Sequence, residues 1–277
     1  MHLRPAHLPN YQDPPVVEVV LGVQFEQLEG FQTVHVGRLW QGFRKDYPKF
    51  VEQPPIGPAF ETFGTRVEAP TVQLKQFTHA PLPRLWFVNE EETELIQFQP
   101  DKFLHNWRKV KDRVPYPHYE HLREKFNSDL EKLEKLLKRE KIGKLKPNQC
   151  EVSYINHILS PDVEDLHSSL GTLFRFWSDR NIPKKTMMLE DTRIAMRFLI
   201  HSKTTKDPVG RLHVTAEPRK VADGTPMIVL NLTARGRPDQ ATAQGVLDFL
   251  DRGREEIVEG FTALTTDKMQ KRWGRIK

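Results

Sequence analysis

The sequence predicts an α+β protein in which one order of elements, strand–helix–four strands–helix, occurs twice. β-rich apolar runs alternate with stretches that have helical apolar spacing. Matching elements recur at a shift of about 133 to 135 residues along the chain. A chain of 277 residues can bury a sizeable core without disulfides or metals. We therefore expect two repeats, residues 1–147 and residues 148–277.

The first repeat opens with a strand at residues 17–25, which are β-branched, apolar and preceded by prolines. Residues 36–47 have apolar side chains spaced i, i+3, i+4, i+7, which predicts a helix. Four short strands are expected next, at residues 59–65, 71–77, 84–88 and 94–99. A long helix follows from about residue 118 to residue 141, and Gly143 ends it.

The second repeat follows the same order, with a strand at residues 149–157 and a helix at residues 163–179. Four strands are expected at residues 186–189, 192–201, 211–217 and 226–233. The closing helix spans about residues 239–263, and a short basic helix at residues 267–275 follows a Thr265-Thr266 start signal.

The repeat is supported by short matches rather than by long identity. Val17-Glu18-Val19 corresponds to Cys150-Glu151-Val152, and Gly37-Arg38-Leu39-Trp40 corresponds to Gly171-Thr172-Leu173-Phe174. Leu95-Ile96-Gln97-Phe98 corresponds to Ile228-Val229-Leu230-Asn231. The doubled order of elements resembles the fold of the TATA-box-binding protein. That resemblance implies one curved antiparallel sheet with helices on one face, and it confers no function by itself.

Several segments also resemble a sporadically distributed bacterial family of about this length. They are Pro14-Pro15-Val16-Val17-Glu18-Val19-Val20-Leu21-Gly22-Val23-Gln24-Phe25-Glu26, Gln97-Phe98-Gln99-Pro100-Asp101-Lys102-Phe103-Leu104-His105-Asn106-Trp107, Pro147-Asn148-Gln149-Cys150-Glu151-Val152-Ser153-Tyr154, Leu264-Thr265-Thr266 and Trp273-Gly274-Arg275. The resemblance implies a cytoplasmic bacterial protein from a phage-defence or toxin–antitoxin context. It brings no catalytic residues with it.

If helices cover one face of the sheet, alternate residues of each strand lie on the other face, which we call the open face. It would be rich in cationic and amide side chains. The candidate ligand-binding residues there are Arg193, Arg197, Arg211, His213, Asn231, Gln97 and Gln99. Such groups hydrogen-bond to base edges or phosphates, although the same composition also suits an ordinary solvated sheet face.

A second candidate is residues 101–117, a basic insertion before the long helix. The candidate ligand-binding residues within it are His105, Asn106, Trp107 and Arg108. Residues 102–146 carry 14 Lys and Arg against 7 Asp and Glu, so the basic excess of the chain lies here. Cations interleaved with aromatic rings suit stacking and phosphate contact on single-stranded nucleic acid. The alternative is a loop whose aromatic side chains anchor it to the core.

Sequence motifs for common enzyme classes are missing. The chain has no G-x-G-x-x-G, no phosphate-binding P-loop, no H-E-x-x-H and no G-x-S-x-G, and Cys150 is its one cysteine. No catalytic residue, metal site or cofactor is therefore predicted. An enzyme with a pocket between sheet and helices, lined by Tyr154, Asn156 and His157, is the less favoured alternative.

These observations favour a non-enzymatic binding module for nucleic acid or another phosphate-bearing ligand. The alternative is a protein-interaction component that binds the product of a neighbouring gene, and a homodimer is a further option. No run of 18 apolar residues predicts a membrane span, and no apolar signal segment is visible at the start of the chain. A cytoplasmic protein is expected.

Overall fold

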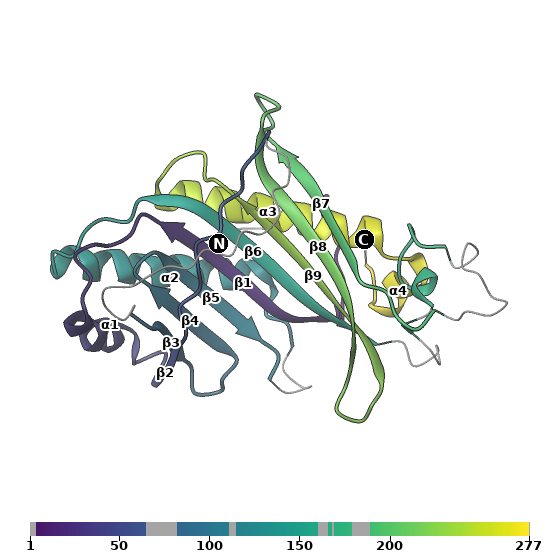
Figure 1. Ribbon diagram of the computed structural model, residues 1–277, viewed down its shortest axis with the longest axis horizontal. Coiled ribbons are helices and arrows are strands. Elements are labelled where there is room, and N and C mark those ends of the chain that lie inside the picture. Colours follow the sequence, from purple (N-terminus) through teal and green to yellow (C-terminus); the bar gives the residue numbers. More distant parts are fainter. Residues whose placement is uncertain are drawn as a thin grey trace.

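A single nine-stranded antiparallel sheet forms the centre of the molecule, as seen in a computed structural model (Figure 1). The structure describes residues 4–64, 82–110, 115–159, 166–167, 169–178 and 189–276. The strands are β1 Val16–Phe25, β2 Lys49–Gln53, β3 Arg84–Val88, β4 Glu94–Gln99, β5 Lys102–Arg108, β6 Pro147–Ile158, β7 Ile194–His201, β8 Pro208–Lys220 and β9 Pro226–Gly236. They are ordered β2-β3-β4-β5-β1-β6-β9-β8-β7 across the sheet, so β1 and β6 join its two halves.

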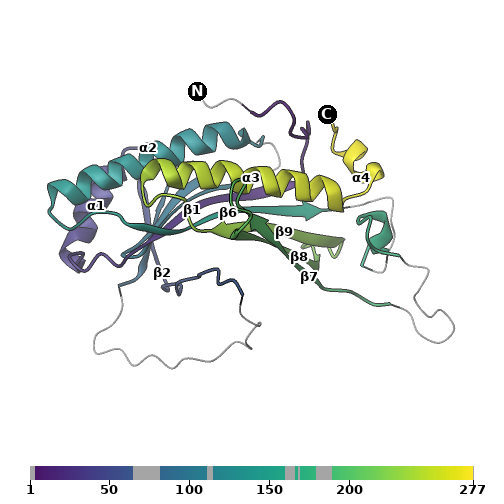
Figure 2. The same cartoon turned by 90° about the horizontal axis from the view of Figure 1, so that it is seen from above.

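The helices lie together on one side of the sheet (Figure 2). The described helices are α1 Val36–Phe43, α2 His118–Arg139, α3 Ala243–Leu264 and α4 Asp267–Arg272, with 3₁₀ turns at Thr33–His35 and Leu170–Thr172. Helix α2 packs on β5 and β1, and α3 packs on β6, β9 and β8. The α+β class and the placement of the helices on an antiparallel sheet are therefore as the sequence predicts.

Local signals explain where α3 and α4 begin. The Thr242 side chain accepts a hydrogen bond from the backbone N–H of Gly245, and Thr266 accepts one from Met269. Both are N-cap bonds, which satisfy backbone donors that a helix start leaves unpaired. The predicted Thr265-Thr266 start signal of the last helix is confirmed.

Close contact between α3 and the sheet depends on a glycine of β9. A Cβ atom at Gly236 would lie 2.5 Å from the Phe249 ring of α3 and 2.4 Å from the Val209 carbonyl oxygen. Real Cβ atoms do not approach other atoms so closely, so this position admits Phe249 only because it carries no side chain. The core under α3 is consequently well packed, and Leu230, Leu232 and Leu250 have no exposed surface.

The predicted insertion at residues 101–117 is not a loop over its first half, because Lys102–Arg108 forms β5 between β4 and β1. Its side chains alternate, with Phe103, His105 and Trp107 toward the helices and Asn106 toward the open face. This period of two, which the basic composition obscures, is the strand signal. Residues 111–114 lie outside the described residues.

Two other expectations also need correction. Residues 59–64 form no strand, whereas Lys49–Gln53 forms the short edge strand β2, which was not predicted. The helix expected at residues 163–179 is reduced, over residues 169–178, to one 3₁₀ turn. There the chain pairs with the end of α3, since the Arg175 N–H donates to the Leu264 carbonyl. The expected strand at residues 71–77 and the start of that at 186–189 lie outside the described residues.

In the part of the chain that the structure describes, no helix is both long enough and apolar enough to cross a membrane.

Candidate functional site

A segment without helix or strand, residues 54–64, crosses the open face of the sheet, and we call it the strap (Figures 1 and 2). Side chains of the sheet bind its backbone. Gln99 accepts the Ile56 N–H at 2.8 Å and donates to the Ile56 carbonyl at 3.1 Å, while Gln24 accepts the Ala59 N–H at 3.0 Å. Prolines 54, 55 and 58 have no N–H, so amide side chains take the place of a backbone ladder here.

The strap ends in a charged cluster formed with β8 and β9. Glu61 is only 3% exposed, and its carboxylate accepts hydrogen bonds from Arg211 and from His213 Nε2, the latter at 2.6 Å. Arg235 Nη1 lies 3.7 Å from the same carboxylate. Arg211 also donates to the Thr62 carbonyl at 3.1 Å. Three basic side chains from two neighbouring strands therefore converge on one carboxylate.

Electrostatics keep Glu61 ionised despite its burial. Burial alone would raise the pKa of the Glu61 carboxyl, but His213 and Arg211 outweigh it and hold that pKa below its ordinary value. Arg235 is shared with a second carboxylate, since its Nε donates to Glu151 Oε2 at 2.7 Å. The cluster thus balances three basic side chains, Arg211, His213 and Arg235, against two acids.

Polar side chains on the other half of the open face bind one another. Gln97 accepts hydrogen bonds from Arg84 at 2.8 Å and from the Trp86 indole at 3.0 Å, and it donates to Asn106 at 2.8 Å. Asn106 donates in turn to Glu18 at 2.6 Å. This chain of bonds runs across β3, β4, β5 and β1, and we call it the amide ladder. Its two amide side chains, Gln97 and Asn106, are buried.

One aromatic ring on this half is flanked by cations. The guanidinium of Arg84 lies 5.4 Å from the centre of the half-buried Trp86 ring, and that of Arg108 lies 5.8 Å from it. Both distances are typical of cation–π contacts. The ring and the two guanidinium groups over it thus form one aromatic and positively charged group on the open face.

The structure divides the predicted site residues into three groups. Arg193 and Arg197 are exposed at β7, and Asn231 is half-buried on the open face between Thr215 and Ile155. Arg211, His213 and Gln99 bind the strap. Gln97 and Asn106 belong to the amide ladder, and Arg108 lies beside it at the Trp86 ring. His105 and Trp107 are corrected, because they are buried on the helix side, 1% and 2% exposed, and have no access to a ligand on the open face.

His105 instead forms a buried ionic cluster between β5, β4 and α2. Its Nδ1 lies 3.5 Å from Asp129 and its Nε2 lies 3.6 Å from Glu94, and the Tyr47 hydroxyl donates to Asp129 at 2.6 Å. Burial alone would lower the pKa of His105, but the two carboxylates outweigh it and raise that pKa. The same pairing lowers the pKa of Asp129 and of Glu94 against their burial.

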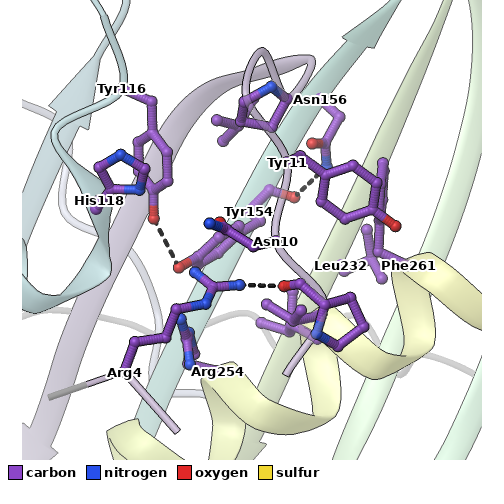
Figure 3. A pocket seen from close by; sticks show the side chains of 15 residues that line it. Arg4, Asn10, Tyr11, Tyr116, His118, Tyr154, Asn156, Leu232, Arg254 and Phe261 are labelled. Carbon is purple, nitrogen blue, oxygen red and sulfur yellow. Dashed lines mark hydrogen bonds between the residues drawn. The ribbon is translucent and has the colours of Figure 1, made fainter. Parts of the chain in front are cut away.

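A small cavity lies on the helix side, where the N-terminal segment passes over β6 and α3 (Figure 3). Its volume is about 60 Å³. Tyr154 and Asn156 line it, as the alternative with a pocket between sheet and helices expects. His157 does not, because it follows Asn156 on an extended strand and so lies on the opposite face.

Two features common at catalytic sites, a metal-binding cluster and a reactive thiol, are absent among the described residues. No cluster of three His, Cys, Asp or Glu side chains there could hold a metal ion. Cys150 is buried, and burial raises the pKa of its thiol above the ordinary value. A buried protonated thiol is a poor nucleophile.

Glu61, Trp86 and Arg235 are among the site residues that escape sequence reasoning. Trp86 and Arg235 lie on strands in which core-facing and open-face residues alternate. Following this alternation two residues further along each strand identifies both side chains as members of the open face. Glu61 lies in a proline-rich segment and meets partners about 150 residues away, which no local pattern signals.

No protein-family model matches the chain, and no curated protein or solved structure matches it.

Proposed function

We propose that this chain is a binding protein whose open face binds a phosphate-bearing ligand. The ligand that we favour is single-stranded nucleic acid. One observation carries the proposal: Arg211, His213 and Arg235 converge on the carboxylate of Glu61. Charged donors arranged around a carboxylate oxygen also suit a phosphate oxygen. In this interpretation Glu61 occupies the place of a ligand phosphate.

The strap is suited to compete with the ligand for the open face, rather than to form a permanent part of the sheet. It is held by side-chain bonds and by the Glu61 cluster, and it pairs with no strand along residues 54–64. Arg197 is the register partner of His213 on the exposed strand β7, so cationic surface continues beyond the strap. A strand of nucleic acid that contacts Arg197 would meet Arg211 and His213 next.

Trp86 favours nucleic acid over other anions. A half-buried indole flanked by the guanidinium groups of Arg84 and Arg108 offers base stacking and phosphate contact on the same open face. A small inorganic anion would gain nothing from this ring. Replacement of Trp86 should therefore weaken oligonucleotide binding without affecting inorganic phosphate.

The test is fluorescence anisotropy with a labelled single-stranded oligonucleotide, for the wild type and for Glu61→Gln. Three phosphate contacts should make the affinity fall about 20-fold between about 50 and about 200 mM salt. Glu61→Gln should bind several-fold more tightly, because the competing carboxylate is gone. Arg211→Ala should bind more weakly than the wild type.

Glu52→Gln is the matched control, since it removes one negative charge from the exposed strand β2 just before the strap. It should leave the affinity near that of the wild type. Equal gains from both Glu variants would mean that net charge, not strap competition, sets the affinity. No salt-sensitive binding by either the wild type or Glu61→Gln would contradict the proposed function.

We also propose that the two halves arose by duplication, and the strand order supports this. From the central pair outward, one half reads β1-β5-β4-β3 and the other reads β6-β9-β8-β7, and each half closes with a 22-residue helix. In this alignment β5 corresponds to β9, so Lys102–Arg108 belongs to the repeat and is not inserted. The proposal also includes the resemblance of this chain to the fold of the TATA-box-binding protein and to the bacterial family.

A partner protein or a second copy is the other candidate, and the edge strand β7 favours it. Phe198 and Leu199 are 44% and 50% exposed there, and among the described residues β7 is the last strand of the sheet. A strand edge with apolar side chains is a common pairing site. Sedimentation analysis of the wild type and of Phe198→Lys tests for a homodimer through β7. Binding of a neighbouring gene's product, lost in the same variant and without any oligonucleotide affinity, would favour this candidate over the first.

A further inference from the structure

The cavity on the helix side brings together two arginines that are distant in sequence (Figure 3). Arg4 comes from the N-terminal segment and Arg254 from the middle of α3. Arg254 is only 2% exposed, and the nearest carboxylate oxygen, of Glu120, is 3.3 Å from its Nη2. Burial and the neighbouring charge of Arg254 both lower the pKa of Arg4. The protein thus holds two close positive charges beside one acid.

Hydrogen-bond donors exceed acceptors around this cavity. Within the described part of the chain, the buried Nε atoms of Arg4 and Arg254 have no acceptor. The hydroxyls of Tyr116 and Tyr154 bond to each other at 2.9 Å, and only one of the two protons can serve that bond. Burial raises the pKa of both tyrosines, so both hydroxyls keep their protons. One hydroxyl proton and two guanidinium N–H groups remain for a ligand.

The opposite wall of the cavity is apolar. It consists of side chains from β1, β9 and α3, namely Val16, Leu232, Ile257, Val258 and Phe261. A volume of about 60 Å³, at roughly 10 to 15 Å³ for each water-sized group, has room for about four to six non-hydrogen atoms. The space therefore suits a molecule with one anionic end and a tail of two or three carbons.

The N-terminal segment that covers the cavity is held from the other end of the chain. Gln12 and Asp13 donate their N–H groups to the carbonyls of Gly274 and Trp273, and the Tyr11 hydroxyl bonds to Thr262 at 2.8 Å. His118, which also lines the cavity, has φ of +65°, a left-handed conformation that costs a non-glycine residue energy. Such strain is concentrated at functional sites more often than elsewhere.

We propose that this cavity is a binding site for a short-chain monocarboxylate such as propionate or butyrate. The carboxylate would accept hydrogen bonds from Arg4, Arg254 and the Tyr116–Tyr154 pair. Its alkyl tail would contact Leu232, Ile257 and Phe261. The site lies on the opposite side of the sheet from the strap, so it does not depend on the function proposed for the open face.

Isothermal titration calorimetry with butyrate and with butyramide tests this assignment, because the two differ little in shape and only butyrate is charged. Butyrate should bind at one site, and butyramide should bind at least tenfold more weakly. Arg4→Ala should weaken butyrate binding about tenfold to hundredfold, the usual range for a lost hydrogen bond to a charged group. Tyr116→Phe, which keeps the ring, should weaken it less.

Two control variants separate this site from general anion binding. Arg44→Ala removes a surface arginine after α1, and Arg211→Ala removes one from the open face; neither should change the butyrate affinity. Equal binding of butyrate and butyramide would overturn the proposal, as would butyrate binding that survives Arg4→Ala. Inorganic phosphate that binds more tightly than butyrate and is lost in Arg4→Ala would overturn the carboxylate assignment. Oligonucleotide affinity unchanged by Arg4→Ala would show that the two sites are separate.

Discussion

The two halves of the open face use similar side chains in opposite ways. On β3, β4, β5 and β1 the amide ladder satisfies itself, because each of Gln97 and Asn106 has a polar partner on a neighbouring strand. On β8 the basic side chains Arg211 and His213 bind the carboxylate of Glu61, which lies outside the sheet. The amide ladder is therefore complete without the strap, whereas Arg211 and His213 depend on it. Gln99 and Gln24 of the first half also bind the strap, but they bind its backbone and not a charged side chain.

This difference shows that the composition of a face does not tell a structural network from a binding surface. Buried polar groups must have partners, and a partner on the next strand makes the network part of the fold. A partner on a segment without regular structure can leave at lower cost, since few backbone bonds break with it. The exchangeable half is therefore the better candidate for a ligand.

The largest expected effect is in the core beneath the amide ladder. His105→Leu removes the buried basic side chain that lies between Asp129 and Glu94. Lys132, 3.3 Å from Asp129, and His121, 3.8 Å from Glu94, remain but are more exposed than His105, so we expect a loss of about 3 kcal/mol in the free energy of unfolding. In the wild type, the contribution of His105 to the free energy of unfolding is fully present below about pH 6.5. It is lost as the pH rises through the raised pKa that His105 has in the folded protein. The contributions of Asp129 and Glu94 are lost as the pH falls below about 4 through their lowered folded pKa values.

Urea denaturation across the pH range measures both sides of this profile. His105→Leu should lack the decline on the alkaline side that the wild type shows. A wild-type stability that does not change between about pH 6 and pH 9 would mean that His105 is neutral in the folded protein.

The second effect compares the same substitution on both halves of the open face. Asn106→Leu removes the central member of the amide ladder, so the side-chain N–H group of Gln97 loses its acceptor and Glu18 loses its donor, at a cost of about 2 to 3 kcal/mol. Asn231→Leu on β9 is the matched change at a half-buried position, and it should cost less than about 1 kcal/mol. Equal losses in urea denaturation would remove the distinction between the two halves.

Glu61→Gln should have a smaller effect on the free energy of unfolding of the whole protein and a larger effect on local opening of the strap. The partners of Glu61 are partly exposed, so the free energy of unfolding should fall by only about 1 kcal/mol. Hydrogen exchange at the Ile56 and Ala59 amides should become several-fold faster, because the strap loses its charged anchor. In the wild type, the protection of these amides relative to their intrinsic exchange rate should fall as the pH falls through the lowered pKa of Glu61. Unchanged exchange in Glu61→Gln would mean that the strap is held independently of this cluster.

The smallest effect on stability is expected from Arg197→Ala. Arg197 is exposed on the edge strand β7, so its loss should change the free energy of unfolding by less than about 0.5 kcal/mol. The same variant should weaken salt-sensitive oligonucleotide binding, which anisotropy measures. A change in stability without a change in binding would place Arg197 in the fold and not in the proposed interface.

The sequence by itself determined the α+β class and most of the elements. It predicted the bounds of β3 and β4 and the start of α2, because period-two and period-3.6 patterns express which side of an element faces the core. It also predicted the polar composition of the open face. These features are local, and each depends on residues within one strand or helix.

Only the tertiary structure decided that Lys102–Arg108 is an interior strand and that Glu61 closes on Arg211 and His213. A basic segment becomes an interior strand when its neighbours β4 and β1 supply hydrogen bonds on both sides and Lys102 finds Asp101 at 3.0 Å. The Glu61 contact joins residues about 150 positions apart, and the cavity joins Arg4 to Arg254. Such meetings follow from how the sheet orders its strands, which no short stretch of sequence encodes.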